Sequence, residues 1–238
     1  MAILTVTAIE MKYSGNHALR GIDMAINPGE IVGLLGPNAS GKTTLMKIIA
    51  GLLQPTRGDI TYPDNATRGI NSKRKISFLP DSFVFPGYMR VKDTFGFYKD
   101  MYPDYLDRRA EEMTELLGLA PVMDTRLHKL SKGMQERVSL ALTFCRQTKL
   151  YLLDEPLGGI DPMGKSKIID AILSMQLEDS SIVISTHLVK DIERIFDSVY
   201  FISQGRIISH GDCDKMREET GKTVEQTYLE VFENEIYI

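Results

Sequence analysis

Short apolar stretches of β-strand length, broken by turn signals, recur from Leu4 to about Ile60. The stretches 4–9 and 21–26 are rich in β-forming residues, and the turn Asn27-Pro28-Gly29 separates the second from the apolar run 31–35. Such runs bounded by Gly, Pro and Asn are typical of strands. We therefore expect strands at these three places and two more farther along, at 59–62 and at 75–80, where Pro80 ends the run.

The pattern changes to helical spacing from about Val91 to Arg146 and then returns to β-rich runs. Breaks within the helical part fall at Pro103, Gly118, Pro121 and the polar run 130–133. Beyond it lie the apolar runs 150–153, 181–185 and 198–202, the first two separated by a helix-length segment at 165–177. This alternation predicts an α/β fold whose parallel strands are buried on both faces, with a mostly α insertion. The polar tail from about Asp212 is expected to be helical near 224–232.

Composition narrows the functional classes. The 238 residues are 43% hydrophobic and 25% charged, which is ordinary for a globular protein. The formal charge of −4 gives no electrostatic footprint for a nucleic-acid partner. The chain has two cysteines, Cys145 and Cys213, far apart and without metal-like spacing, so reduced thiols in a cytosolic protein are expected. We expect neither a secretory leader nor a membrane span, because no window reaches the required apolar length.

The candidate chemistry begins in the loop 36–44, which lies between an apolar strand and a helical segment. Gly36 and Gly41 allow successive backbone N–H groups to point at phosphate oxygens, and the following helix presents its positive N-terminal end. Lys42 can reach the β and γ phosphates, and the hydroxyl of Thr43 can bind Mg²⁺. This strand–loop–helix context predicts a nucleotide site whose loop contributes further ligands, namely Asn38, Ser40 and Thr44.

Two adjacent carboxylates, Asp154 and Glu155, follow the buried strand 150–153. Residues at the C-terminal ends of strands in an α/β sheet face the crevice where ligands bind. Asp154 is therefore expected to hold Mg²⁺ through water, and Glu155 to polarise the water that attacks the γ phosphate. His187 follows the strand at 181–185 and is expected beside the same crevice, although a lone histidine there is more often structural.

Taken in order, these segments resemble the nucleotide-binding subunit of ATP-binding-cassette (ABC) transporters, and the resemblance covers roughly residues 2–212. The matching elements are the Walker A loop 36–44, the Walker B strand 150–154 with Glu155, the signature 130–134, the D-loop 158–161, the switch histidine His187, and Tyr13 at the position of the aromatic residue that stacks on adenine. The resemblance implies an ATPase that uses ATP and Mg²⁺.

The resemblance also implies the arrangement of the fold. A P-loop NTPase (RecA-like) core with a mostly parallel sheet and an N-terminal antiparallel β subdomain is expected at about 1–81 and 150–212. A helical subdomain is expected at about 82–149. Together these parts form one ABC ATPase domain at 1–212, and a helical tail follows at 213–238.

In the family this protein resembles, two cassettes close around two ATP molecules. The signature residues Ser131 and Gly133, with Asp161 of the D-loop, are then expected to face the nucleotide held by the opposite subunit. A homodimer or paired cassette would drive a separately encoded integral membrane transporter subunit. The chain is accordingly expected in the cytoplasm, at the inner face of the cell membrane.

Three positions depart from the family pattern. Lys132 and Met134 stand where the signature usually has glycine and glutamine, and Asp81 stands where glutamine usually follows the strand at 75–80. An acid at this last position is frequent in chains that resemble drug and antibiotic exporters, which favours an exporter. Asp81 can still approach Mg²⁺ or its waters as an oxygen ligand, but when ionised it cannot donate a hydrogen bond.

Two other functions fit the sequence less well. A soluble ABC-type ATPase acting on ribosomes or DNA is disfavoured, because such chains usually join two cassettes or insert a long coiled coil. A P-loop kinase or GTPase is disfavoured by the signature segment and by Tyr13. The aromatic-rich segment 83–88 is a candidate contact for the membrane partner, with packing between the two lobes an equally good interpretation.

Overall fold

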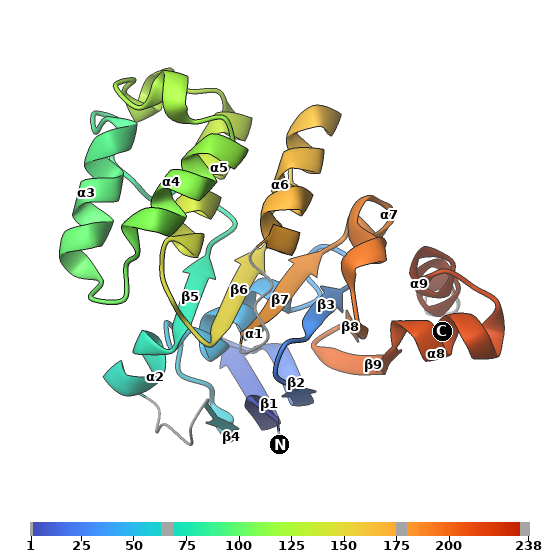
Figure 1. Ribbon diagram of the computed structural model, residues 1–238. Coiled ribbons are helices and arrows are strands. Elements are labelled where there is room, and N and C mark those ends of the chain that lie inside the picture. The colour runs from blue at the N-terminus through green and yellow to red at the C-terminus, as the bar shows by residue number, and fades with distance from the viewer. Residues whose placement is uncertain (1, 63–68, 175–179, 234–238) are drawn as a thin grey trace.

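The computed structural model describes residues 2–62, 69–174 and 180–233. Within these ranges the chain forms two sheets and a set of helices (Figure 1). A three-stranded antiparallel sheet has the order β2-β1-β4, and a six-stranded sheet has the order β5-β6-β7-β3-β8-β9. The strands are β1 (Leu4–Tyr13), β2 (Asn16–Ile26), β3 (Ile31–Leu35), β4 (Arg57–Thr61), β5 (Ile76–Leu79), β6 (Leu150–Asp154), β7 (Ser181–Thr186), β8 (Ser198–Ser203) and β9 (Arg206–Asp212).

The larger sheet is parallel from β5 to β8 and ends in the antiparallel edge strand β9. Its inner strands are buried on both faces: Leu150 and Leu152 of β6 face one apolar core, whereas Tyr151 and Leu153 face the other. This is the period-two alternation of a strand between two covered surfaces. The parallel strands predicted from the apolar runs are confirmed.

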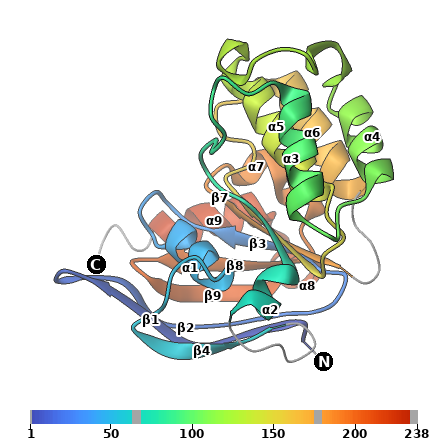
Figure 2. The same ribbon diagram turned by 90° about the vertical axis from the view of Figure 1, so that its left-hand side faces the viewer.

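The helices cover the two faces of this sheet unequally. Helix α1 lies between the two sheets (Figure 2), where Leu45, Met46 and Ile49 join the core shared by both. Most of the other helices lie on the opposite face or beyond its ends. The helices are α1 (Lys42–Ile49), α2 (Ile70–Arg74), α3 (Val91–Met101), α4 (Asp107–Leu116), α5 (Lys132–Phe144), α6 (Pro162–Ser174), α7 (Val189–Ile192), α8 (Cys213–Thr220) and α9 (Val224–Glu233).

Several expected boundaries were wrong in detail. The second strand begins at Asn16 rather than Gly21, because its pairing with β1 continues to the Tyr13–Asn16 turn. The short helix α2 and the edge strand β9 were not predicted. Every position of β9 is half-buried or exposed, so the strand carries no buried apolar run. Helix α6 begins at Pro162, before the expected Lys165, and residues 175–177 of the expected helix lie outside the described residues.

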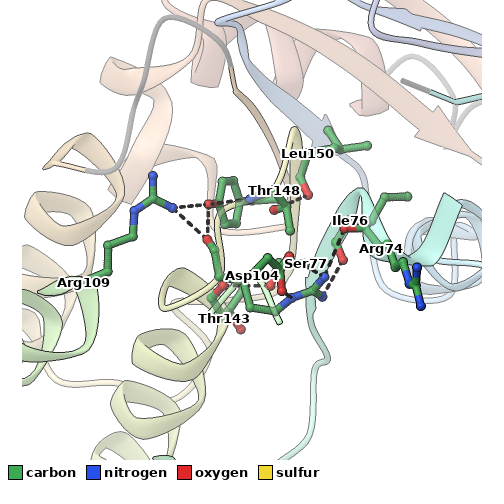
Figure 3. A network of polar contacts seen from close by, with 10 residues as sticks. Arg74, Ile76, Ser77, Asp104, Arg109, Thr143, Thr148 and Leu150 are labelled. Atoms are coloured by element: carbon green, nitrogen blue, oxygen red, sulfur yellow. Dashed lines mark hydrogen bonds and ion pairs between the residues drawn. The ribbon is translucent and has the colours of Figure 1, made fainter. Parts of the chain in front are cut away.

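A buried polar network joins α5 to β5 and β6. Arg146 follows α5 and donates to the carboxylate of Asp104 at 3.1 and 3.0 Å, to the carbonyl of Ile76 at 2.7 Å and to that of Arg74 at 3.2 Å (Figure 3). The Arg146 guanidinium also lies 4.1 Å from the centre of the Tyr102 ring. Because each nitrogen of this buried cation has an acceptor, the network fixes the helices α3–α5 to the sheet edge.

None of the helices in the described ranges combines the length and apolar character that a membrane span requires. Both cysteines are buried free thiols.

Candidate functional site

A cleft of about 600 Å³ opens where the parallel strands end. Nine of the residues predicted for the site line it: Tyr13, Asn38, Ser40, Gly41, Lys42, Thr43, Thr44, Asp81 and Glu155. They come from the end of β1, the β3–α1 loop and the ends of β5 and β6. The sheet topology therefore brings together side chains that lie far apart in the sequence.

The β3–α1 loop depends on glycine at two positions. Gly41 has a φ of 113°, a left-handed conformation that L side chains rarely adopt, and it directly precedes α1. A Cβ on Gly36 would lie 2.2 Å from the carbonyl oxygen of Ile202. No side chain caps the N-terminus of α1, so its first N–H groups face the cleft as donors for an anion.

Lys42 places a buried cation in the loop. Its ammonium group donates to the carbonyl oxygens of Gly36 at 2.8 Å and Pro37 at 3.1 Å, and lies 3.4 Å from Glu155 Oε1. Burial lowers the pKa of Lys42, while the charges of Glu155 and Asp154 oppose that change. The site thus pairs one cation with two carboxylates in partly desolvated surroundings.

Asp154 is fully enclosed at the end of β6. One carboxylate oxygen accepts a hydrogen bond from the Ser185 hydroxyl, and the other has no hydrogen-bond partner in the part of the chain that the structure describes. Burial raises the pKa of Asp154, whereas the hydrogen bond from Ser185 and the nearby Thr43 hydroxyl lower it. Ser40 Oγ and Glu155 Oε2 are likewise buried without a partner among the described residues. Carboxylate oxygens left unpaired here fit Mg²⁺, and the Ser40 hydroxyl can donate a hydrogen bond to a phosphate oxygen.

Glu155 and His187 are in direct contact. The Nδ1 atom of His187 lies 3.0 Å from Glu155 Oε1. The backbone of Glu155 has a φ of 50°, an uncommon value outside glycine, and its N–H donates to the Ser185 carbonyl at 3.0 Å. Backbone held in this region is concentrated at functional sites, where surrounding contacts maintain it. His187 therefore lies beside the cleft, as its position after β7 predicts.

The signature and D-loop residues lie elsewhere on the surface. Ser131 is exposed and caps α5 by accepting a hydrogen bond from the Met134 N–H at 3.3 Å. Asp161 is also exposed and accepts from the Gly164 N–H at 3.0 Å. Neither of them, nor Gly133, is among the described residues that line the cleft. Within one chain the two halves of the predicted site remain separate.

Some lining residues were missed in the sequence. Asn16, His17, Ala18 and Arg20 come from the start of β2, and Gln204 and Gly205 from the turn after β8. The second group could have been found, because β8 ends at the same sheet edge as β3. The residues at the start of β2 could not have been found, because only the pairing of β1 with β2 brings them beside Tyr13.

The aromatic segment 83–88 is only partly exposed. The rings of Phe83 and Phe85 are 5.8 Å apart, and Phe85 lies 5.8 Å from the ring of Tyr98 in α3, so these two residues pack onto the helices. Val84 and Tyr88 are exposed by 64% and 74%. Phe83 and Phe85 therefore pack inward, whereas Val84 and Tyr88 leave part of the segment exposed.

A second cleft of about 550 Å³ lies between α3 and the end of α1, and its lining includes Tyr98, which contacts Phe85 of this segment. Its walls are mainly apolar and aromatic, including Leu52, Phe78, Tyr98 and Met101, and its polar groups are largely cationic: Lys73, Arg74 and Arg146, with Asp104.

Comparison with known proteins identifies relatives of the whole fold. The family model described as ABC transporter matches residues 19–158. The energy-coupling factor transporter ATP-binding protein EcfA3 of Clostridium perfringens is 34% identical over 221 residues, which cover 88% of this chain and 78% of that protein.

Solved structures share the same architecture. One, described as the ATP-binding subunit of an ABC transporter, has a TM-score of 0.86 at 24% identity and covers 97% of this chain and 99% of its own. Another, an ATP-binding cassette in a dimeric post-hydrolysis state bound to ADP and Pi, has a TM-score of 0.79 at 22% identity over 88% and 98% of the two chains. At these identities the likeness establishes the fold, and the predicted P-loop NTPase fold is confirmed.

Proposed function

Because the chain belongs to the ABC transporter family of ATP-binding proteins, we propose that it binds ATP in the cleft at the ends of β3 and β6 and hydrolyses it there to drive a membrane transporter. The observation that carries this proposal is the contact of the Glu155 carboxylate with both Lys42 and His187 at the mouth of the phosphate-type loop.

The binding half of the site consists of the loop and its neighbours. The N–H groups at the start of α1 and the ammonium of Lys42 hold the phosphates, with Asn38, Ser40 and Thr44 beside them. Tyr13, exposed by 43% at the rim of the cleft, offers a ring face on which adenine can stack. Mg²⁺ held by Thr43 and Asp154, with Asp81 within reach of its waters, would neutralise phosphate charge.

The hydrolytic half is Glu155 with His187. Glu155 accepts the proton of the attacking water, and His187 holds the carboxylate in place through its ring nitrogen. Lys42 lies 3.4 Å from this carboxylate and stabilises the phosphate as negative charge develops.

A second copy of the chain completes the site. Ser131 and Gly133 form an anion-binding surface at the N-terminus of α5 that is exposed and separate from the chain's own cleft. Two copies facing each other would place this surface, and Asp161, on the ATP of the opposite copy. The γ phosphate then holds the dimer together, and hydrolysis releases it.

The membrane partner is assigned to the second cleft and to the exposed residues of segment 83–88. The apolar walls and the cationic edge fit a cytoplasmic helix with an apolar face and an acidic side chain. This contact would hold the chain in the cytoplasm against the membrane.

We also propose that the chain divides into a core (about 1–81 and 150–212), a helical subdomain (about 82–149) and a tail (213–238). From the acid at Asp81 we propose that the transporter it drives is an exporter.

Phosphate release tests the proposal. The purified chain should release phosphate from ATP in the presence of Mg²⁺, and His187→Ala should lower the turnover number by about a hundredfold, because Glu155 loses its partner. The matched control is His210→Ala, since His210 is exposed on β9 and stacks on Tyr200 away from the cleft. A wild-type chain without turnover, or equal turnover for His187→Ala and the control, would refute the assignment.

A further inference from the structure

The segment that carries His187 has little internal support. His187 lies between the end of β7 and α7, and α7 has four residues before it passes into a 3₁₀ turn at Glu193–Ile195. A helix of one turn forms a single set of backbone hydrogen bonds and is not stable alone. The position of His187 therefore depends on the elements that pack against α7.

One support comes from α6. The ammonium of Lys165 lies 2.6 Å from the Asp191 carboxylate, and both side chains are partly buried. This ion pair joins α7 to the helix that follows the D-loop.

The other support comes from α9, near the end of the chain. The N–H of Glu225, in the first turn of α9, donates to the Glu193 carboxylate at 2.8 Å. A carboxylate at a helix N-terminus also interacts favourably with the helix dipole. Thr223 and Gln226 fix the start of α9 by reciprocal side chain to backbone hydrogen bonds at 2.9 and 3.1 Å. The tail is thus joined to the end of α7 at a defined position.

The aromatic face of α9 anchors it on the central sheet. The rings of Tyr228 and Phe232 are 4.5 Å apart, and both lie near Phe201 of β8, at 6.4 and 6.5 Å. These rings belong to the same apolar core as Leu188 and Val189, the two residues after His187. Burial raises the pKa of Tyr228, and the negative charge of Glu155 raises it further. Helix α9 lies beside α7 (Figures 1 and 2).

We propose that α9 positions the His187 segment for hydrolysis, so that the C-terminal tail determines the turnover number while leaving nucleotide affinity unchanged. The inference rests on the proposed roles of Glu155 and His187. Tyr228, Phe232 and Glu193 act through α7 and are positioning residues. Catalytic groups must be held within about 0.5 Å of the productive geometry, so a small shift of α7 is sufficient to slow hydrolysis.

The test compares variants within the tail. Tyr228→Ala combined with Phe232→Ala should lower kcat for ATP about tenfold, with the Kd for trinitrophenyl-ATP changed less than twofold and with faster amide hydrogen exchange at 188–195. Tyr228→Phe should keep most of kcat, because it preserves the packing. Glu193→Gln leaves the aromatic face intact and should give a smaller decrease in kcat. Leu229→Ala is the matched control, since Leu229 is half exposed on the same helix.

Three outcomes would overturn the inference. Unchanged kcat in the double variant, when exchange in α9 shows that its packing is lost, would mean that α9 does not position His187. A parallel loss of affinity and kcat would mean that the tail stabilises the whole fold only. Equal effects of Leu229→Ala and the double variant would exclude the aromatic face. Failure of the proposed function is distinct: there the wild-type chain shows no turnover, or Glu155→Gln retains it.

Discussion

Glu136 is a buried carboxylate close to the signature residues. It lies on α5 with 8% of its surface exposed, and burial raises its pKa to about 7; Lys132 lowers this pKa and Asp81 raises it. The sequence around Glu136 is polar and gives no sign of its burial, because burial there follows from the packing of α5 against the sheet. Asp81, by contrast, could be assigned to the cleft from its place after a buried strand.

The Glu136 carboxyl makes stability depend on pH. Its folded pKa of about 7 exceeds the ordinary value of 4.5, so its favourable contribution is complete below about pH 4.5 and is lost as pH rises through 7. Glu136→Gln should therefore raise the unfolding free energy relative to wild type by roughly 2 kcal/mol at pH 8 and leave it nearly unchanged at pH 4.5. Urea unfolding at both pH values measures this, with the exposed Glu112→Gln as control. An equal effect at both pH values would contradict the burial argument.

At the scale of elements, the loop and strand ends were predictable because short stretches of sequence encode them. Gly36, Gly41 and Lys42 sit in one turn between a strand and a helix, and the structure places them together as the pattern requires. The β9 edge strand and the start of β2 could not be predicted, because their polar, half-exposed positions gain their structure from a neighbouring strand.

The Arg146 network gives a stability prediction for the connection between α5 and the sheet. Arg146→Met should lower the unfolding free energy by about 3 kcal/mol, because Asp104 loses its partner and the carbonyls of Ile76 and Arg74 lose a donor. Thermal or urea unfolding measures the change. Arg108→Met is the matched control: Arg108 is 88% exposed in an i,i+4 pair with Glu112, and such pairs contribute under about 0.5 kcal/mol. Equal decreases in the unfolding free energy for Arg146→Met and Arg108→Met would contradict a stabilising role of the buried Arg146 network.

At the scale of the whole molecule, the two apolar cores and the sheet between them explain why the motifs converge. Parallel strands end at one edge, so loops from Gly36 to His187 meet there whatever their separation in sequence. The location of the cleft could therefore be predicted from residue order. The support that α9 gives to the His187 segment could not be predicted from residue order, because it depends on aromatic contacts between the tail and β8.

The separation of Ser131 and Gly133 from the cleft also belongs to this scale. Because this exposed helix start and the open phosphate-type cleft are separate on one chain, we propose that they face each other across two copies. We therefore propose that the site that holds ATP in one copy is completed by Ser131 and Gly133 of the other copy.

Sedimentation of Glu155→Gln with saturating ATP and Mg²⁺ tests this claim most directly. Without the general base the chain should bind ATP, turn over at least a hundredfold more slowly than wild type, and sediment as a dimer holding two ATP molecules. The same chain without nucleotide should be a monomer, and adding Ser131→Arg should restore the monomer in ATP. A Glu155→Gln chain that remains monomeric with ATP bound would contradict the composite site.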